Sequence, residues 1–514
     1  MFGPISRRNF VKGTLGAGAL AGLGEFAFLK HLPPVGAAEA PVTPAAVQFS
    51  SDIEPLVRLI EETPRAQAVA AVIEKIKGGT SYQQLLSAVL LAGVRNIQPR
   101  PVGFEFHCVL AVHSAHQAAL AAADRERWLP LLWAVDTFKA SQATKRVTKK
   151  DNWVLPVLQE GQLPGAVQAK ARFIEAMDAW DEEGADRAVA ALARSAGANE
   201  VFELFARYGA RDFRDIGHKA IYVANGFRTL HTIGWRHAEP VLRSLAFALL
   251  DHNRQDGNPA KSDLEPDRPW RENLKRAARI RGDWQRGKAD PQAAAELLAV
   301  LRKGDQAEGP EAVVEMLNKG IDPACVWDGL FLMAGELLMR QPGIVGLHCV
   351  TSTNALHYAY TASGNDETRR MLTLQTAAFL PMFRKAMGGR GRVRDDIRID
   401  TLEKADFKAK GTEAVEEIFA EVSKNKEQAA RKALALMAED AGAGDALLAV
   451  GRRLVFSKGF DSHDYKFSSA AMEDYYSATP HWRGRFLASS LFWLHGAGDR
   501  DNDLIRRARE ALKA

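Results

Sequence analysis

The sequence is poor in cysteine, with only Cys108, Cys325 and Cys349 among 514 residues. So few cysteines, in odd number, cannot supply the framework of paired disulfides that stabilises many small exported proteins. Long apolar runs are missing as well: beyond residue 37 no stretch reaches the roughly 18 apolar residues that a helix needs to span a bilayer. We therefore expect no stable transmembrane anchor, and a fold stabilised by an apolar core, for which a hydrophobic fraction of 46% is ample.

An excess of charge of one sign is also missing from the body of the chain. The formal net charge is +5, but +3 of it lies within the first 37 residues. The remainder is close to neutral, which gives no bulk electrostatic attraction for a polyanion. The sequence therefore predicts no nucleic-acid partner.

Several common catalytic motifs are absent. The chain contains no H-E-x-x-H, C-x-x-C-H, G-x-S-x-G or P-loop sequence, which weighs against common zinc proteases, c-type cytochromes, α/β-hydrolases and nucleotide enzymes. No alternating strand pattern persists either, whereas stretches such as AVAAVIEKI (68–76) and RAVAALARSA (187–196) combine strong helix formers with apolar residues at helical spacing. The predicted fold class is all-α.

Residues 1–37 have the pattern of a twin-arginine export signal. Arg7 and Arg8 precede a weakly hydrophobic, glycine- and alanine-rich run at 13–24, and small residues at 35–37 offer a cleavage site. The alternative is a basic N-terminal helix or membrane anchor. An export signal predicts a periplasmic or otherwise exported protein with the twin-arginine export machinery as a partner. Because this route carries folded proteins, often loaded with a cofactor, it also favours a metal or organic cofactor.

One histidine-containing sequence motif occurs twice in the chain. HCVLAVHSAHQA begins at His107 and HCVTSTNALHYA begins at His348, 241 residues later. Further blocks match in the same order on both sides of a charged bridge. This repetition predicts an internally duplicated helical body with pseudo-twofold related halves: a first helical repeat at 38–255, a bridge at 256–307 and a second repeat at 308–514. A shared site is expected between the halves.

The duplicated blocks pair the following histidines: His107 with His348, His116 with His357, and His218 with His463. Residues nine positions apart lie on opposite faces of a helix, so His107 and His116 cannot share one target. Small residues follow on the faces of His107 and His348, which leaves space beside both imidazoles. We favour these two as inward-facing groups and keep His116 and His357 as the alternative pair.

His218 and His463 are both expected near the start of a helix. With His107 and His348 they would bring four imidazoles together, a set that suits iron, copper, nickel or zinc. Three aspartates are available as acceptors for ring N–H groups or as helix caps: Asp215, Asp461 and Asp464. The competing interpretation is that the repeated histidines serve the architecture alone.

Four blocks, FEFHCVLAVHSAH, RDIGHKAIY, VGLHCVTSTNALHYA and DSHDYKF, resemble the questin oxidase-like family. The resemblance implies an all-helical enzyme that uses oxygen on anthraquinone-type rings at a non-haem iron. It also implies the ligand set His107, His218, His348 and His463, with Lys466 modified to a carbamate as a further ligand. The export signal and the long segment between His348 and His463 depart from the family, so a shared metal site with a different substrate is expected. For Lys466 the alternative is a solvated side chain.

These features together predict an exported metal-dependent oxidoreductase. We expect a non-haem iron oxygenase that acts with O2 on a small aromatic or quinone-like compound, with Lys466 as the catalytic residue and zinc or manganese as alternative metals. The alternative function is a non-enzymatic periplasmic binding or scaffold protein with structural histidines. A third interpretation is a haem held non-covalently by two axial histidines.

Overall fold

The structure is a computed structural model that describes residues 46–148, 153–406, 408–440 and 442–513. The predicted signal segment 1–37 lies outside these residues. Within them the secondary structure is helical, with no strand and with two isolated β-bridges, Ala46 to Pro156 and Lys288 to Ile321. The prediction of an all-α fold is confirmed. None of the helices in this part of the chain has the combination of length and apolar character that crossing a membrane requires.

The first part of the chain forms the following helices: α2 (Glu54–Glu62), α3 (Arg65–Lys77), α4 (Tyr82–Asn96), η3 (Phe104–Phe106), α5 (His107–Leu110), α6 (Val112–Leu120), η4 (Asp124–Glu126), α7 (Leu129–Thr148), η5 (Glu160–Gln162), α8 (Ala166–Ala179), α9 (Glu182–Ser195), α10 (Ala198–Gly209), η6 (Asp215–Gly217), α11 (His218–Ile233), η7 (Trp235–His237) and α12 (Ala238–Leu249).

The second part continues as follows: η8 (Arg254–Asp256), η9 (Glu265–Asp267), α13 (Arg268–Ala277), α14 (Pro291–Lys303), α15 (Glu308–Asn318), α16 (Pro323–Arg340), α17 (Ile344–Ala362), α18 (Asp366–Gly388), α19 (Gly411–Val422), α20 (Lys426–Glu439), α21 (Ala443–Lys458), α22 (Ser462–Ser477), α23 (Arg483–Ser490) and α24 (Asp503–Lys513).

The helix boundaries follow local sequence signals. Ser81 caps α4 in a reciprocal capping box with Gln84, and Asp461 caps α22 in the same way with Asp464. Such pairs satisfy backbone N–H groups that have no partner inside the helix. Pro323 is the first residue of α16, where its fixed φ suits the helix and its missing N–H is not needed.

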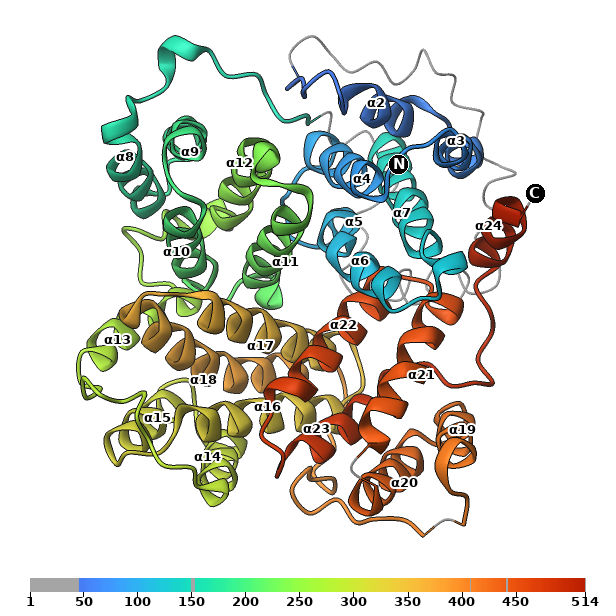
Figure 1. Ribbon diagram of the computed structural model, residues 1–514. Helices are drawn as coiled ribbons and strands as arrows, with labels where there is room; N and C mark the ends of the chain where they lie inside the picture. Colours follow the sequence, from blue (N-terminus) through green and yellow to red (C-terminus); the bar gives the residue numbers. More distant parts are fainter. Residues whose placement is uncertain (1–45, 149–152, 407, 441, 514) are drawn as a thin grey trace, which may run out of the picture.

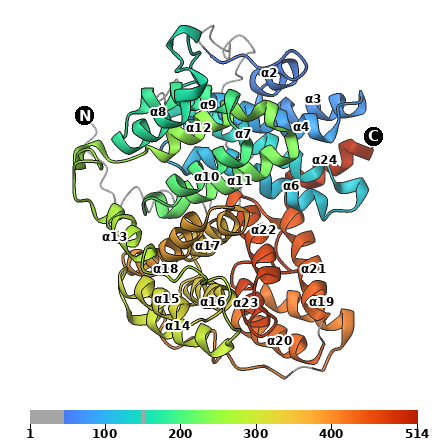
Figure 2. The same cartoon turned by 60° about the vertical axis from the view of Figure 1, so that its left-hand side comes forward.

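The two parts of the chain form two stacked layers of helices. Figures 1 and 2 show α2 to α12, coloured blue to green, above α13 to α23, coloured yellow to red; α24 returns to pack on α3 and α7. One continuous cluster of buried apolar residues runs through both layers. The charged stretch 256–307 contributes α13, which packs on α18, and α14, which packs on α16, so it is part of the body. The internal duplication itself stays a prediction.

Four helical segments meet where the two layers touch. The segment α5–α6 and helix α11 come from the upper layer, and α17 and α22 come from the lower one. α11 packs on α17 and α6, and α22 packs on α17 and α6, so the four close around a common centre. The centre therefore receives side chains from parts of the sequence more than 350 residues apart.

Candidate metal centre

Four imidazole rings lie at this centre, one from each helical segment. His107 and His218 are the first residues of α5 and α11, His463 is the second residue of α22, and His348 lies in the second turn of α17. The ring centroids form a closed circuit in which neighbours are 4.9, 4.3, 5.1 and 4.5 Å apart, in the order His107, His218, His348, His463 and back to His107. The structure thus brings together the four histidines that the sequence predicts as ligands.

Each ring directs its Nδ1 atom at an oxygen close to it in the sequence. The Nδ1 distances are as follows: His107 to Phe104 O, 2.9 Å; His218 to Asp215 O, 2.5 Å; His348 to Ile344 O, 2.7 Å; and His463 to the Asp461 carboxylate, 3.4 Å. A carbonyl oxygen accepts and does not donate, so in the first three rings Nδ1 must carry the proton. The Nε2 atom of each neutral ring is then an unprotonated donor to a metal.

The Nε2 atoms of His107 and His218 face each other at 2.9 Å. Two unprotonated nitrogens have no proton to share, so this contact requires either a protonated ring or a cation beside both lone pairs. Two ring nitrogens that bind one ion must lie close together, because each would be about 2.0–2.1 Å from it. Ligand nitrogens of these two rings and of His348 all lie within 4.8 Å of one another. The spacing fits a metal ion.

Protonation of the rings is disfavoured where they lie. Burial lowers the pKa of His107, His218 and His348 well below the usual imidazole value, and the nearby Lys466 lowers each pKa further. Neutral imidazole is the form that binds metal. His107, His218 and His348 therefore favour their metal-binding form at neutral pH.

His463 completes the circuit from the outer side. Its ring lies against those of His107 and His348, and its Nε2 atom is buried without a hydrogen-bond partner among the described residues. A buried polar atom that has no partner loses its interaction with water without compensation. A bound ion would give this nitrogen its partner, so we include His463 in the candidate ligand set.

Lys466 lies one turn after His463 on α22 and is almost fully buried, with 2% of its surface exposed. Its Nζ atom is 3.5 Å from Nε2 of His348, and it forms no ion pair with any carboxylate in the part of the chain that the structure describes. Burial lowers the pKa of Lys466 to about 7, although Asp461 opposes the shift. The interpretation of Lys466 as a solvated side chain is wrong, because the packing of α22 on α17 and α5 encloses it.

The alternative pair of histidines lies elsewhere. His116 bonds through Nδ1 to the Tyr82 hydroxyl at 2.9 Å, and His357 packs between Trp327 and Phe331. Of the three aspartates, Asp461 faces Nδ1 of His463 with its carboxylate, Asp215 contributes its backbone carbonyl, and Asp464 completes the capping box of α22 and contacts His495.

The turn before His218 is a feature that the sequence did not point to. Asp215, Ile216 and Gly217 have φ angles of 49°, 46° and 82°, a left-handed run that costs conformational energy at non-glycine residues. It positions the Asp215 carbonyl under the His218 ring. The glycine preceding histidine in RDIGH was the available signal. Ser352, four residues after His348, packs against this glycine, and its hydroxyl is buried without a hydrogen-bond partner in the described chain.

Substitution of Gly217 by alanine is expected to weaken metal binding at least tenfold, because a Cβ at this position would lie 2.3 Å from Ser352 Oγ and the positive φ would be strained. Gly79→Ala is the matched control: Gly79 has φ 98° with no atom within 4 Å of its Cβ position. It should lower stability by about 1–2 kcal/mol and leave metal content unchanged. Metal analysis and thermal unfolding of both variants check this; equal metal content would contradict a positioning role for the turn.

Comparison with known proteins identifies the N-terminus alone. Residues 4–24 match the twin-arginine translocation (TAT) pathway signal sequence. The chain is therefore exported by the twin-arginine route. No curated protein and no solved structure gives a significant match to the chain. The questin oxidase-like resemblance thus gains no support from these comparisons.

Proposed function

We propose that this protein is an exported metalloenzyme whose four-histidine centre holds one transition-metal ion. The observation that carries the proposal is the 2.9 Å contact between Nε2 of His107 and Nε2 of His218, whose Nδ1 atoms both face carbonyl oxygens. Neither ring is readily protonated there, and a shared cation removes the repulsion between the two lone pairs. Export in the folded state allows such an ion to be loaded before the protein crosses the membrane.

We further propose that the ion is iron and that the protein is a non-haem oxygenase for an aromatic or quinone-like compound. Imidazole ligands are compatible with iron, zinc and manganese, and the sequence resemblance favours iron with O2. Such an iron ion would supply one-electron chemistry with oxygen. The chain's own residues would supply a buried and largely neutral surrounding, in which His107, His218, His348 and His463 hold the ion through Nε2.

Lys466 is the proposed catalytic residue. A neutral amine has a lone pair that can take up a proton, and its nitrogen can also attack the carbon of CO2 and lose a proton to form a carbamate, as the sequence resemblance implies. What supports this role is the distance of 3.5 Å between Nζ and Nε2 of His348. Burial lowers the pKa of Lys466 to about 7, against the opposing effect of Asp461, so a large part of the amine is neutral near pH 7.

The test is elemental analysis of protein exported through its own signal, together with a visible spectrum. We expect close to one iron per chain and no Soret band. Zinc or manganese at the same stoichiometry would retain the metal centre and exclude the iron oxygenase. A Soret band would identify a haem protein. Folded protein without stoichiometric metal, with an unfolding midpoint unaffected by chelator, would overturn the proposal and leave the histidines as architecture.

A further inference from the structure

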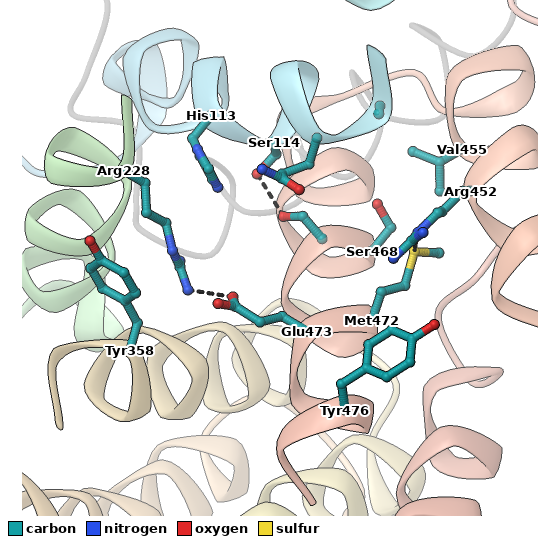
Figure 3. Close-up of a pocket in the computed structure, with 13 residues that line it drawn as sticks. His113, Ser114, Arg228, Tyr358, Arg452, Val455, Ser468, Met472, Glu473 and Tyr476 are labelled. Atoms are coloured by element: carbon teal, nitrogen blue, oxygen red, sulfur yellow. Dashed lines mark hydrogen bonds and ion pairs between the residues drawn. The ribbon is translucent and has the colours of Figure 1, made fainter. Parts of the chain in front are cut away.

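A cavity of about 400 Å³ lies between α6, α11, α17, α21 and α22, of which α11, α17 and α22 also carry metal-centre histidines. Figure 3 shows side chains from all five helices around it. The size lies within the usual range of small-molecule sites, about 300–1,000 Å³. None of the proposed metal ligands lines this cavity, so it requires a separate explanation.

One positive charge in the cavity wall is not neutralised. Arg228 forms an ion pair with Glu473 and bonds to the Asn354 side chain. Arg452 has no such partner: its Nε atom lies 3.2 Å from the Met472 sulfur, and no carboxylate among the described residues pairs with it. The side chain is half-buried and faces the cavity (Figure 3). A guanidinium in this position is suited to a planar carboxylate, which it can bind through two parallel N–H donors.

His113 provides a second polar group without a partner. Its side chain is 92% buried and reaches into the cavity from α6 (Figure 3). Its Nδ1 atom is buried and has no hydrogen-bond partner in the described chain. A ligand carboxylate oxygen would give Nδ1 the partner that it lacks, with the ring proton on Nδ1. Burial and then Arg228 lower the pKa of His113 well below the usual value, so the ring is a neutral donor.

Part of the remaining wall is suited to a flat apolar body, beside polar side chains that include Gln117 and Ser468. Val455, Met472 and the rings of Tyr358 and Tyr476 line it. The Tyr358 ring is held by Arg228, whose guanidinium carbon lies 4.1 Å from the ring centroid. Aromatic and thioether surfaces of this kind pack well against planar rings.

The cavity wall continues along α22 toward the metal centre. Ser469, in its wall, donates through Oγ to the carbonyl of Lys466 one turn earlier and bonds across to Ser114 of α6 at 2.9 Å. A ligand in the cavity would therefore lie about one helical turn beyond Lys466 along α22. This neighbourhood links the cavity with the proposed chemistry.

From these observations we propose that the cavity is the substrate site of the proposed enzyme and binds an aromatic compound with one carboxylate, which pairs with Arg452 and accepts from His113. That the bound compound is a substrate rests on the proposed function. That the cavity binds an aromatic carboxylate does not depend on it. Arg452 is the one cation in the cavity lining without a carboxylate partner in the described part of the chain, which favours a monoanion over a neutral ring or a dianionic phosphate ester.

The experiment compares 2-naphthoate with 2-naphthamide, which has the same ring and no charge. Calorimetric titration is made on the full mature chain, both metal-loaded and after chelator treatment. Naphthoate is expected to bind at least tenfold more tightly than the amide, since hydrogen bonds to a charged group contribute that much or more. The difference should vanish in Arg452→Gln and return in Arg452→Lys; the side chain is half-buried, so both variants should fold.

Equal affinity for the two compounds, no binding of either, or an unchanged preference in Arg452→Gln would overturn the inference. The two proposals fail separately. Preferential naphthoate binding by a protein that holds no metal would contradict the proposed metalloenzyme and support the anion site. Stoichiometric iron without naphthoate binding would do the reverse.

Discussion

Substitution of His218 by alanine is expected to abolish stoichiometric metal binding, with an affinity at least a hundredfold lower than that of the wild type. The ring supplies one of two nitrogens 2.9 Å apart at the centre, and it lies between His107 and His348 in the circuit. Loss of an outer group that only orients a ligand already weakens metal binding about 10–100-fold, so loss of a ligand should cost more. Metal content after gel filtration, and competition with a chelator of known affinity, measure the effect.

His231→Ala is the matched control, because His231 lies on the same helix, α11, but is exposed and outside the cluster. It should keep full metal content. Single substitutions of His107, His348 and His463 should behave like that of His218. Full metal occupancy in all four single variants would exclude the proposed centre, whatever their activity.

The second large effect concerns two buried lysines that differ in their partners. Lys219 is paired with Asp212 at 3.0 Å and donates to two backbone carbonyls, whereas Lys466 has no carboxylate partner among the described residues and lies beside His348. Lys219→Met would leave the Asp212 carboxylate buried with Arg214 as its remaining partner. We expect it to lower the free energy of unfolding by about 3 kcal/mol, the lower end of the range for breaking a buried ion pair.

Lys466→Met should have the opposite profile. Methionine has a similar length, and removal of a buried amine that has no ion-pair partner removes a cost of desolvation. The unfolding midpoint of the metal-free protein should stay the same or rise, while metal affinity falls at least tenfold and any oxygen-dependent activity is lost. Denaturation curves and metal titrations of both variants distinguish the two effects.

A Lys466→Met protein that unfolds as readily as Lys219→Met would show that the amine serves stability. Unchanged metal affinity together with unchanged activity would remove Lys466 from the proposed site. In either case the histidine variants would still test the metal centre independently, because their readout is metal content.

Local patterns in the sequence determined several features by themselves. The twin arginines and the run that follows them specify export, because the export machinery reads a short linear segment. Helical spacing and strong helix formers specify an all-α fold, because these signals repeat over many turns. The repeated frame around His107 and His348, and the matching positions of His218 and His463, selected the four imidazoles that meet at the centre.

Only the tertiary structure decided the burial, the protonation state and the charge pairing of those residues. Lys466 is near charged neighbours in the sequence, and only the packing of α22 on α17 and α5 shows that it is buried. The Nε2 contact between His107 and His218 depends on how two distant helices meet, and their protonation depends on carbonyls brought under each ring by local backbone turns. Likewise, only the fold shows that Arg452, unlike most arginines of the chain, has no carboxylate partner among the described residues. Burial, the meeting of the rings and charge pairing arise between segments far apart in the chain, so no local pattern encodes them.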